Sequence, residues 1–89
     1  MAKVICASRL EGIGPCHLVK YPGNTVREVI TAMGDDYPRL SSYILDDQGQ
    51  LRKHVAIFVG GVLVPKAQAL ATTVNPQEEI YIMQALSGG

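Results

Sequence analysis

The sequence predicts an α+β roll, in which a mixed sheet of four to five strands is covered by one main helix packed across it. Short apolar runs of strand-like alternation lie near both ends of the chain, a single capped amphipathic segment begins at Thr25, and a tight hairpin pattern surrounds Gly60 and Gly61. The 89 residues are 47% hydrophobic, enough for one modest core. We expect one folded domain over residues 1–84 and a flexible C-terminal diglycine tail over residues 85–89.

The first two strands are predicted on either side of a turn. Residues 3–7 (KVICA) are rich in β-branched side chains, and residues 17–21 (HLVKY) alternate between apolar and polar positions. Between them, Gly12, Gly14 and Pro15 break any regular structure. This segment lacks the further glycine and the lysine of a phosphate-binding loop, so we interpret it as the turn of a hairpin.

The strongest local signal is the start of the helix. Thr25 and Glu28 have the spacing of a capping box, in which both side chains accept hydrogen bonds from backbone N–H groups at a helix start. An apolar stripe at helical spacing follows, made by Val26, Val29, Ile30 and Met33. Gly34 is the expected left-handed C-terminal cap. The helix should therefore begin at this box and pack its apolar face against a sheet.

The middle of the chain has a weaker pattern. Residues 37–45 are compatible with a short helical turn followed by an extended piece, and residues 46–49 (DDQG) form a predicted solvated turn. Residues 55–59 and 62–64 are predicted strands that flank Gly60 and Gly61, and we expect neither strand to lie at a polar edge. Residues 67–74 have no clear pattern. Residues 80–84 form the last predicted strand.

The sequence ends at Ser87-Gly88-Gly89, shortly after that last strand. Neither glycine has a Cβ atom, so the terminal backbone can enter a narrow channel and adopt conformations that other residues resist. The five residues from Ala85 can extend roughly 17 Å. Such a tail can carry its terminal carboxylate into the active site of another protein.

A docking surface for such a protein is predicted from strand alternation. We expect the aliphatic side chains of the two long strands, including those of Ile80 and Ile82, to face the helix. The opposite faces then present an apolar patch of partner-binding side chains near the tail, made by Phe58, Tyr81 and Met83 together with Leu86.

Composition argues against several functions. Eight basic residues balance eight acidic ones without a basic cluster, which argues against nucleic-acid binding. The longest apolar run, residues 55–64, is too short to span a membrane, and no signal peptide is evident, so we expect a cytoplasmic protein. Cys6 and Cys16 are expected to be reduced thiols, and with His17 and His54 they lack zinc-site spacing. We predict no metal.

Several segments occur in the order typical of one protein family. They are residues 23–29 (GNTVREV), 37–38 (YP), 45–52 (LDDQGQLR), 57–61 (IFVGG), 79–80 (EI) and 85–89 (ALSGG). The sequence resembles the β-grasp, ubiquitin-like sulfur-carrier proteins of the ThiS/MoaD family, which serve thiamin and molybdopterin synthesis. It is most similar to the CysO-like and QbsE-like branch, which serves cysteine and thiocarboxylate-siderophore synthesis. Two turns depart from the family pattern: Gly60-Gly61 stands where Asn-Gly is common, and residues 75–77 (NPQ) replace an Asp-Gly-rich turn.

The resemblance implies a carrier and not an enzyme. A ubiquitin-activating-type adenylyltransferase would use ATP to adenylate Gly89, and a sulfur donor would then displace AMP to leave a terminal thiocarboxylate. Gly88 would permit close approach, while Ala85, Leu86 and Ser87 would form the stem in the partner's channel. The chain itself would bind no cofactor, its sulfur being covalently attached at the C-terminus.

The resemblance also implies further partners. The sulfur acceptor would be a biosynthetic enzyme, such as a cysteine-synthase-like protein that uses pyridoxal phosphate. In the siderophore branch, a metalloprotease removes residues that follow the diglycine. Two other functions remain open: a ubiquitin-like modifier joined to target lysines through Gly89, and a non-catalytic β-grasp interaction module whose diglycine has no chemistry.

Overall fold

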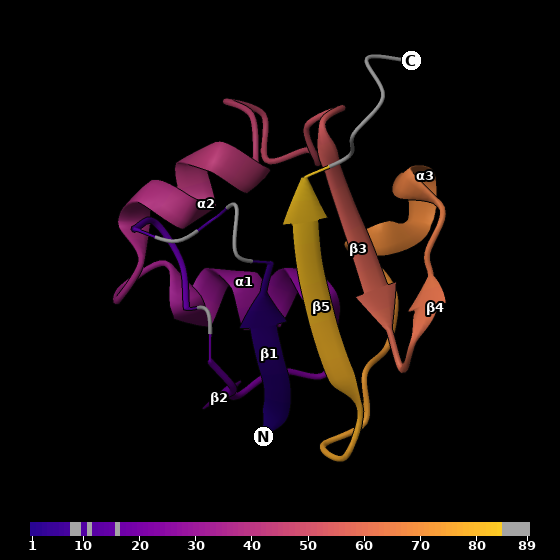
Figure 1. Ribbon diagram of the computed structural model, residues 1–89. Helices are drawn as coiled ribbons and strands as arrows, with labels where there is room; N and C mark the ends of the chain where they lie inside the picture. The colour runs from indigo at the N-terminus through magenta and orange to yellow at the C-terminus, as the bar shows by residue number, and fades with distance from the viewer. Residues whose placement is uncertain (8–9, 11, 16, 85–89) are drawn as a thin grey trace.

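The computed structural model describes residues 1–7, 10, 12–15 and 17–84, and its elements are arranged as Figure 1 shows. In chain order the elements are β1 (Ala2–Cys6), β2 (Val19–Tyr21), α1 (Val26–Met33), α2 (Pro38–Ile44), β3 (Val55–Val59), β4 (Val62–Leu63), α3 (Lys66–Ala69) and β5 (Glu79–Gln84). This is the predicted α+β roll, with the expected hairpin at the start, a main helix and a last strand. The second and fourth strands are shorter than expected.

The five strands form one mixed sheet in the order β2-β1-β5-β3-β4. β1 and β5 run parallel, and the other neighbouring strands run antiparallel. The last strand therefore lies at the centre of the sheet, between the first strand and β3 (Figure 1). As a result, the segment that leads to residue 84 is held on both sides by backbone hydrogen bonds.

The core lies between the sheet and the helices. The predicted stripe of α1 is buried, and so are the predicted aliphatic positions of β3 and β5. The buried side chains of these three elements are Val26, Val29, Ile30, Met33, Val55, Ile57, Val59, Ile80 and Ile82. These strands therefore turn their aliphatic faces toward the helices, as the sequence predicted.

The predicted capping box is present at the start of α1. The Thr25 hydroxyl accepts a hydrogen bond from the Glu28 backbone N–H (3.3 Å), and the Glu28 carboxylate accepts one from the Asn24 N–H (2.7 Å). The glutamate thus reaches one residue further back than in the usual box. Both side chains satisfy backbone donors, which fixes where the helix begins.

The end of α1 differs from the prediction. Gly34 has right-handed helical angles (φ −60°, ψ −25°), so the expected left-handed cap was wrong. A Cβ atom at this position would lie 3.3 Å from the Thr31 carbonyl oxygen and 3.7 Å from the Ser41 Cβ. The contact with Ser41 of α2 would be an ordinary one, so the tighter neighbour of a side chain here is the Thr31 carbonyl of α1 itself.

The segment after α1 is more helical than predicted. α2 occupies seven residues, begins with Pro38 in its first turn and buries Leu40 and Ile44. The expected extended piece is reduced to a single bridge between Leu45 and Leu51. A proline is well tolerated in a first helical turn, because its missing N–H has no partner there. The sequence pattern therefore underestimated this helix.

The hairpin between β3 and β4 has the predicted turn. Gly60 and Gly61 both have positive φ angles (60° and 84°), as a two-residue hairpin turn of this kind requires. However, β4 lies at the edge of the sheet, and Val62 and Leu63 are 67% and 57% exposed. The expectation that neither strand lies at a polar edge therefore holds for β3, which is an interior strand, and was wrong for β4, which is a solvent-exposed edge strand.

The segment after β4 contains a helix that the sequence did not predict. α3 is only four residues long and buries a single side chain, that of Ala69. So short a helix cannot show an apolar stripe, which explains why its segment looked unpatterned. Among the residues that the structure describes, no helix is long and apolar enough to cross a membrane.

Candidate functional site

The outer face of the central strands carries the three predicted docking residues that the structure describes. Phe58, Tyr81 and Met83 occupy alternate positions to the buried aliphatic side chains, and each is half-buried. Phe58 lies directly opposite Tyr81 in the ladder. Their rings meet edge to face, with centroids 6.2 Å apart and an interplanar angle of 64°. This geometry is a favourable aromatic pairing.

The register extends this pair into a row across four strands. Ile5 of β1 lies opposite Tyr81, and Leu63 of β4 lies opposite Phe58. We call the four residues Ile5, Tyr81, Phe58 and Leu63 the outer apolar row. Sequence reasoning missed Ile5 and Leu63, because their partnership with the aromatic residues depends on strand pairing. The only available signal was the alternation of each strand considered by itself.

A shallow apolar hollow adjoins this row. It has a volume of about 270 Å³ and is lined by Phe58, Gly61, Glu79, Tyr81 and Met83. An added Cβ atom at Gly61 would have nothing within 4 Å, so the turn leaves this side of the hollow open. The hollow can accept an apolar side chain of a partner protein, with one carboxylate at its rim.

Charged side chains lie next to the row, and one of them, Glu79, also lines the hollow. Lys3 precedes Ile5 by two residues, and Glu79 precedes Tyr81 by two. Lys3 lies opposite Lys20 of β2 on one side and opposite Glu79 of β5 on the other. Lys20 and Glu79 are exposed, and Lys3 is half-buried. We call Lys20, Lys3 and Glu79 the charged row. The outer face therefore combines an apolar surface with a neighbouring charged one.

The tail itself lies outside the described residues. Ala85, Leu86, Ser87, Gly88 and Gly89 were predicted as the stem and the reacting end, and Leu86 also as part of the docking patch. Their roles stay predictions. The described chain reaches Gln84, which pairs with Val55 at the end of β5. The central strand thus delivers the chain to a point five residues before Gly89.

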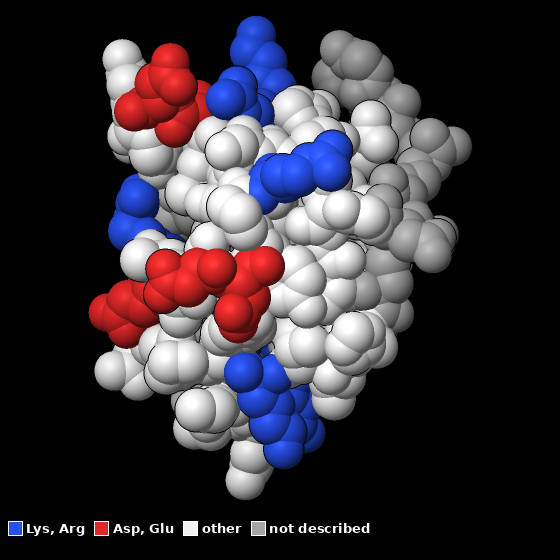
Figure 2. Space-filling view, turned by 90° about the vertical axis from the view of Figure 1, so that its left-hand side faces the viewer, with Lys and Arg blue, Asp and Glu red and all other residues white. Residues whose placement is uncertain are grey.

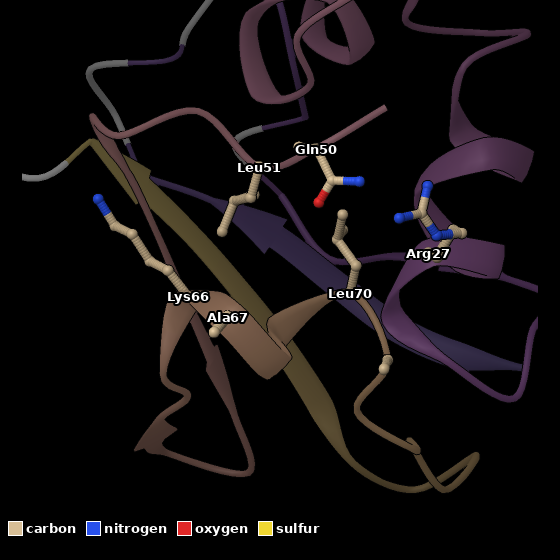
Figure 3. A pocket seen from close by; sticks show the side chains of 7 residues that line it. Arg27, Gln50, Leu51, Lys66, Ala67 and Leu70 are labelled. Carbon is tan, nitrogen blue, oxygen red and sulfur yellow. The ribbon is translucent and has the colours of Figure 1, made fainter. Parts of the chain in front are cut away.

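A second hollow lies on the helix side of the sheet, with a volume of about 330 Å³. Figure 3 shows Arg27 and Lys66 on opposite sides of it, with Leu51 and Leu70 between them. The Arg27 Nη1 donates a hydrogen bond to the Gly49 carbonyl oxygen (3.0 Å), which holds this guanidinium against the loop. Its lining contains no cysteine, histidine or carboxylate, so it offers neither a nucleophile nor a general base.

The side chains of Tyr21 and Asp46 have clearly shifted pKa values, and both belong to local structure. The hydrogen bond that Tyr21 donates to the Asp36 carboxylate (2.6 Å), with partial burial, raises the pKa of Tyr21 to about 12. The Gln50 backbone N–H, followed by that of Gln48, lowers the pKa of Asp46. Neither group lies on the outer face of the sheet.

Charges elsewhere are mixed. On the side of the molecule that Figure 2 presents, acidic and basic side chains alternate without a large area of one sign. Over the described residues, no group of three or more histidine, cysteine, aspartate or glutamate side chains is placed to hold a metal ion.

Comparisons with known proteins agree on one family and one fold. A sequence model of the ThiS family matches residues 16–89. A chain in the crystal structure of the Amycolatopsis orientalis BexX/CysO complex is 19% identical, with a TM-score of 0.84 and complete coverage of both chains. Mycobacterium tuberculosis CysO is 24% identical, with a TM-score of 0.82 over 97% of this chain and 100% of that one.

A third solved structure is that of a modifier. Small archaeal modifier protein 1 from Methanosarcina acetivorans is 25% identical, with a TM-score of 0.79 over 99% of this chain and 95% of its own. No curated protein sequence matches the chain. These structures share the ubiquitin-like β-grasp fold, which confirms the predicted fold class.

Proposed function

The chain belongs to the ThiS family, and from this premise we propose that it is a small sulfur carrier whose Gly89 is converted to a thiocarboxylate. One observation carries the proposal: the family match runs through the diglycine to residue 89, and the central strand β5 ends at Gln84, five residues before it. A strand paired on both sides and followed by a five-residue tail suits a group that must reach into another protein. We propose that the chain acts as a carrier and co-substrate and not as an enzyme.

The proposed chemistry follows from the weak reactivity of a carboxylate. The α-carboxyl group, with a pKa near ~3.5, is ionised at neutral pH and is a poor electrophile. Its oxygen would attack the α-phosphorus of ATP bound by the activating partner, so that pyrophosphate leaves. Hydrosulfide supplied by the sulfur donor would then attack the Gly89 carbonyl carbon, AMP would leave, and the sulfur would lose its proton to water. The product would be a thiocarboxylate, and ATP would supply the energy. We propose that the reaction takes place in the cytoplasm.

The tail residues would have different roles according to the size of their side chains. Gly88 and Gly89 have no side chains, so the activating enzyme can close around the backbone at the reacting carbon. Ala85, Leu86 and Ser87 would extend through the channel that leads there. On this proposal, glycine is needed where the enzyme closes on the reacting carbon, and side chains can be accommodated in the wider channel around the stem.

The outer apolar row would supply the binding surface for the activating partner. Its aromatic pair is half-buried and lies on two adjacent inner strands of the sheet, and aromatic residues at the centre of an interface often dominate its binding energy. The hollow beside it, lined by Met83 and Gly61, would take an apolar side chain from the partner. Tyr81 of this row lies on β5, the strand that leads into the tail, so docking there would direct Gly89 toward the partner's active site.

For the sulfur acceptor we propose a biosynthetic enzyme that holds an amino-acid precursor, such as a cysteine-synthase-like enzyme that uses pyridoxal phosphate. A siderophore pathway with a tail-processing metalloprotease is the related possibility. This step rests on the sequence segments that resemble the cysteine and siderophore branch.

A second function is favoured by one comparison. The likeness to small archaeal modifier protein 1 extends over nearly all of both chains at 25% identity. In a modifier the same Gly89 adenylate would be formed, and the final nucleophile would be a lysine amine of a target protein. The two functions share activation and differ in what receives the glycine carbonyl.

The intact mass of the chain purified from its native host distinguishes these functions. We expect a species with one oxygen replaced by sulfur, absent when Gly89 is deleted. Adducts linked through Gly89 to lysines, without any sulfur-bearing species, would instead establish the modifier. An unmodified chain under conditions of high sulfur demand, together with full tolerance of the Gly89 deletion, would contradict both and favour a plain interaction module.

A further inference from the structure

Two lysines of the charged row face each other across neighbouring strands. Lys3 of β1 and Lys20 of β2 are directly opposite in an antiparallel ladder. The neighbours of Lys3 on β1, Ala2 and Val4, are buried, so both lysines extend from the outer face of the sheet. Directly opposed side chains have Cβ atoms only ~5 Å apart, and like charges in this arrangement are unfavourable. The fold gains nothing from this pair.

The carboxylates of the described residues do not neutralise this pair. Glu79 is opposite Lys3 in the parallel ladder between β1 and β5. Within the described residues, however, neither lysine forms an ion pair or a side-chain hydrogen bond with it or with any other carboxylate. Two positive charges thus stand beside one negative charge. The three residues of the charged row therefore carry a net positive charge next to the outer apolar row.

The distance between the two rows suits one binding partner. Lys3 precedes Ile5 by two residues on the same strand, a separation of ~7 Å at ~3.3 Å per residue. A protein that covers the apolar row would therefore also cover the lysines and remove water around them. A carboxylate becomes the favourable neighbour for two such ammonium groups, because an uncompensated charge at an interface is costly.

We propose that the activating partner places an acidic side chain over Lys3 and Lys20 while its apolar residues cover the outer apolar row. This inference rests on the proposed function, since it names the chemistry of the surface that engages the carrier. The apolar row supplies affinity. The lysine pair sets the orientation and speeds the encounter, as charges at the rim of an interface do.

The variant Lys20→Glu separates partner binding from folding, because it should weaken binding to the activating partner without lowering the stability of the fold. A glutamate opposite Lys3 replaces repulsion by attraction, so the Tm of the variant should be equal to or higher than that of the wild type. Engagement of an acidic partner should weaken. Lys66→Glu is the matched control: it makes the same charge change at an exposed position on α3, on the helix side of the sheet.

The test uses ATP–pyrophosphate exchange catalysed by the ubiquitin-activating-type adenylyltransferase of the same organism, with the carrier as substrate. For Lys20→Glu we expect the KM for the carrier to rise at least ~10-fold at low salt with kcat nearly unchanged. We also expect the salt dependence of the wild type to be steeper than that of the variant. Lys66→Glu should leave both parameters close to wild type.

The outcomes are distinguishable. Exchange by the wild type with an unchanged KM for Lys20→Glu would overturn the inference and leave the proposed function standing. Equal losses for Lys20→Glu and Lys66→Glu would show a general charge effect and would also overturn it. Absence of exchange with the wild-type carrier would contradict the proposed function, and the inference would fail with it.

Discussion

The two faces of β3 and β5 differ in what their side chains do, although they belong to the same short strands. On the inner face Ile57, Ile80 and Ile82 are at most 1% exposed and pack beneath the helices. On the outer face Phe58 and Tyr81 are half-buried, larger, and covered by no other element of the described chain. Alternation thus separates a face that stabilises the fold from a face available for recognition.

The largest expected effect comes from the inner face. Ile82→Ala removes buried methyl and methylene groups at the centre of the sheet and should lower the free energy of unfolding by ~2–5 kcal/mol. The milder variant Ile82→Val should cost only ~0.5–1.5 kcal/mol. Urea unfolding measures both. A loss below ~1 kcal/mol for the alanine variant would mean that this face does not form the core.

The outer face should show the reverse pattern. Tyr81→Ala should raise the KM for the carrier in pyrophosphate exchange by about 30-fold, as expected for a binding hot spot worth ~2 kcal/mol. Its loss of unfolding free energy should be smaller than that of Ile82→Ala. Tyr81→Phe keeps the ring and serves as control. If Tyr81→Ala were strongly destabilised with normal activation, the assignment of the two faces would be reversed.

The Gly60–Gly61 turn joins the two strands that carry Phe58 and Leu63. Gly61 has a φ angle of +84°, and an added Cβ atom there would have no neighbour within 4 Å, so a side chain would not clash. Gly61→Ala should therefore cost ~1 kcal/mol from backbone conformation alone. Gly61→Asn, which tolerates positive φ, should cost less. Thermal unfolding of the two variants tests this expectation. Equal losses of unfolding free energy for Gly61→Ala and Gly61→Asn would contradict the conformational explanation.

The smallest effect is expected at β2, away from both central strands. The pKa of Tyr21 is raised to about 12 by its hydrogen bond to Asp36, so the folded state favours the protonated phenol. The stability that this provides is complete below pH ~10, the unfolded pKa, and is lost as pH rises toward 12. Relative to Tyr21→Phe, the wild type should lose stability over this window. If the unfolding free energies of the wild type and Tyr21→Phe changed in parallel with pH, the hydrogen bond to Asp36 would not be the cause of the raised pKa.

The sequence predicted those parts of the fold that depend on neighbours along the chain. Thr25 and Glu28 located the helix start, and Gly60 and Gly61 located the hairpin, because capping and turn chemistry act over a few residues. Gly34 was wrongly predicted as a left-handed cap, because a glycine after an apolar stripe does not show which backbone conformation it adopts, and here it keeps right-handed helical angles. α3 was missed because four residues are too few to show a period.

The candidate site was predictable only in part, for the same reason. Alternation correctly placed Phe58 and Tyr81 opposite the core. Ile5 and Leu63 could not be added to them, because no single strand shows which residues of other strands lie beside it. The pairing of Lys3 with Lys20 likewise depends on register. The roles of Gly88 and Gly89 remain predictions.

The most direct test of sulfur carriage is localisation of the sulfur at the level of peptides. The chain from sulfur-demanding native cells would be alkylated, digested and fragmented in a mass spectrometer. We expect the alkylated sulfur on the Gly89 carbonyl in the C-terminal peptide, and none there in the wild type from cells that lack the adenylyltransferase. An additional sulfur atom found only on the thiol of Cys6 or Cys16, with an unmodified Gly89, would contradict the account.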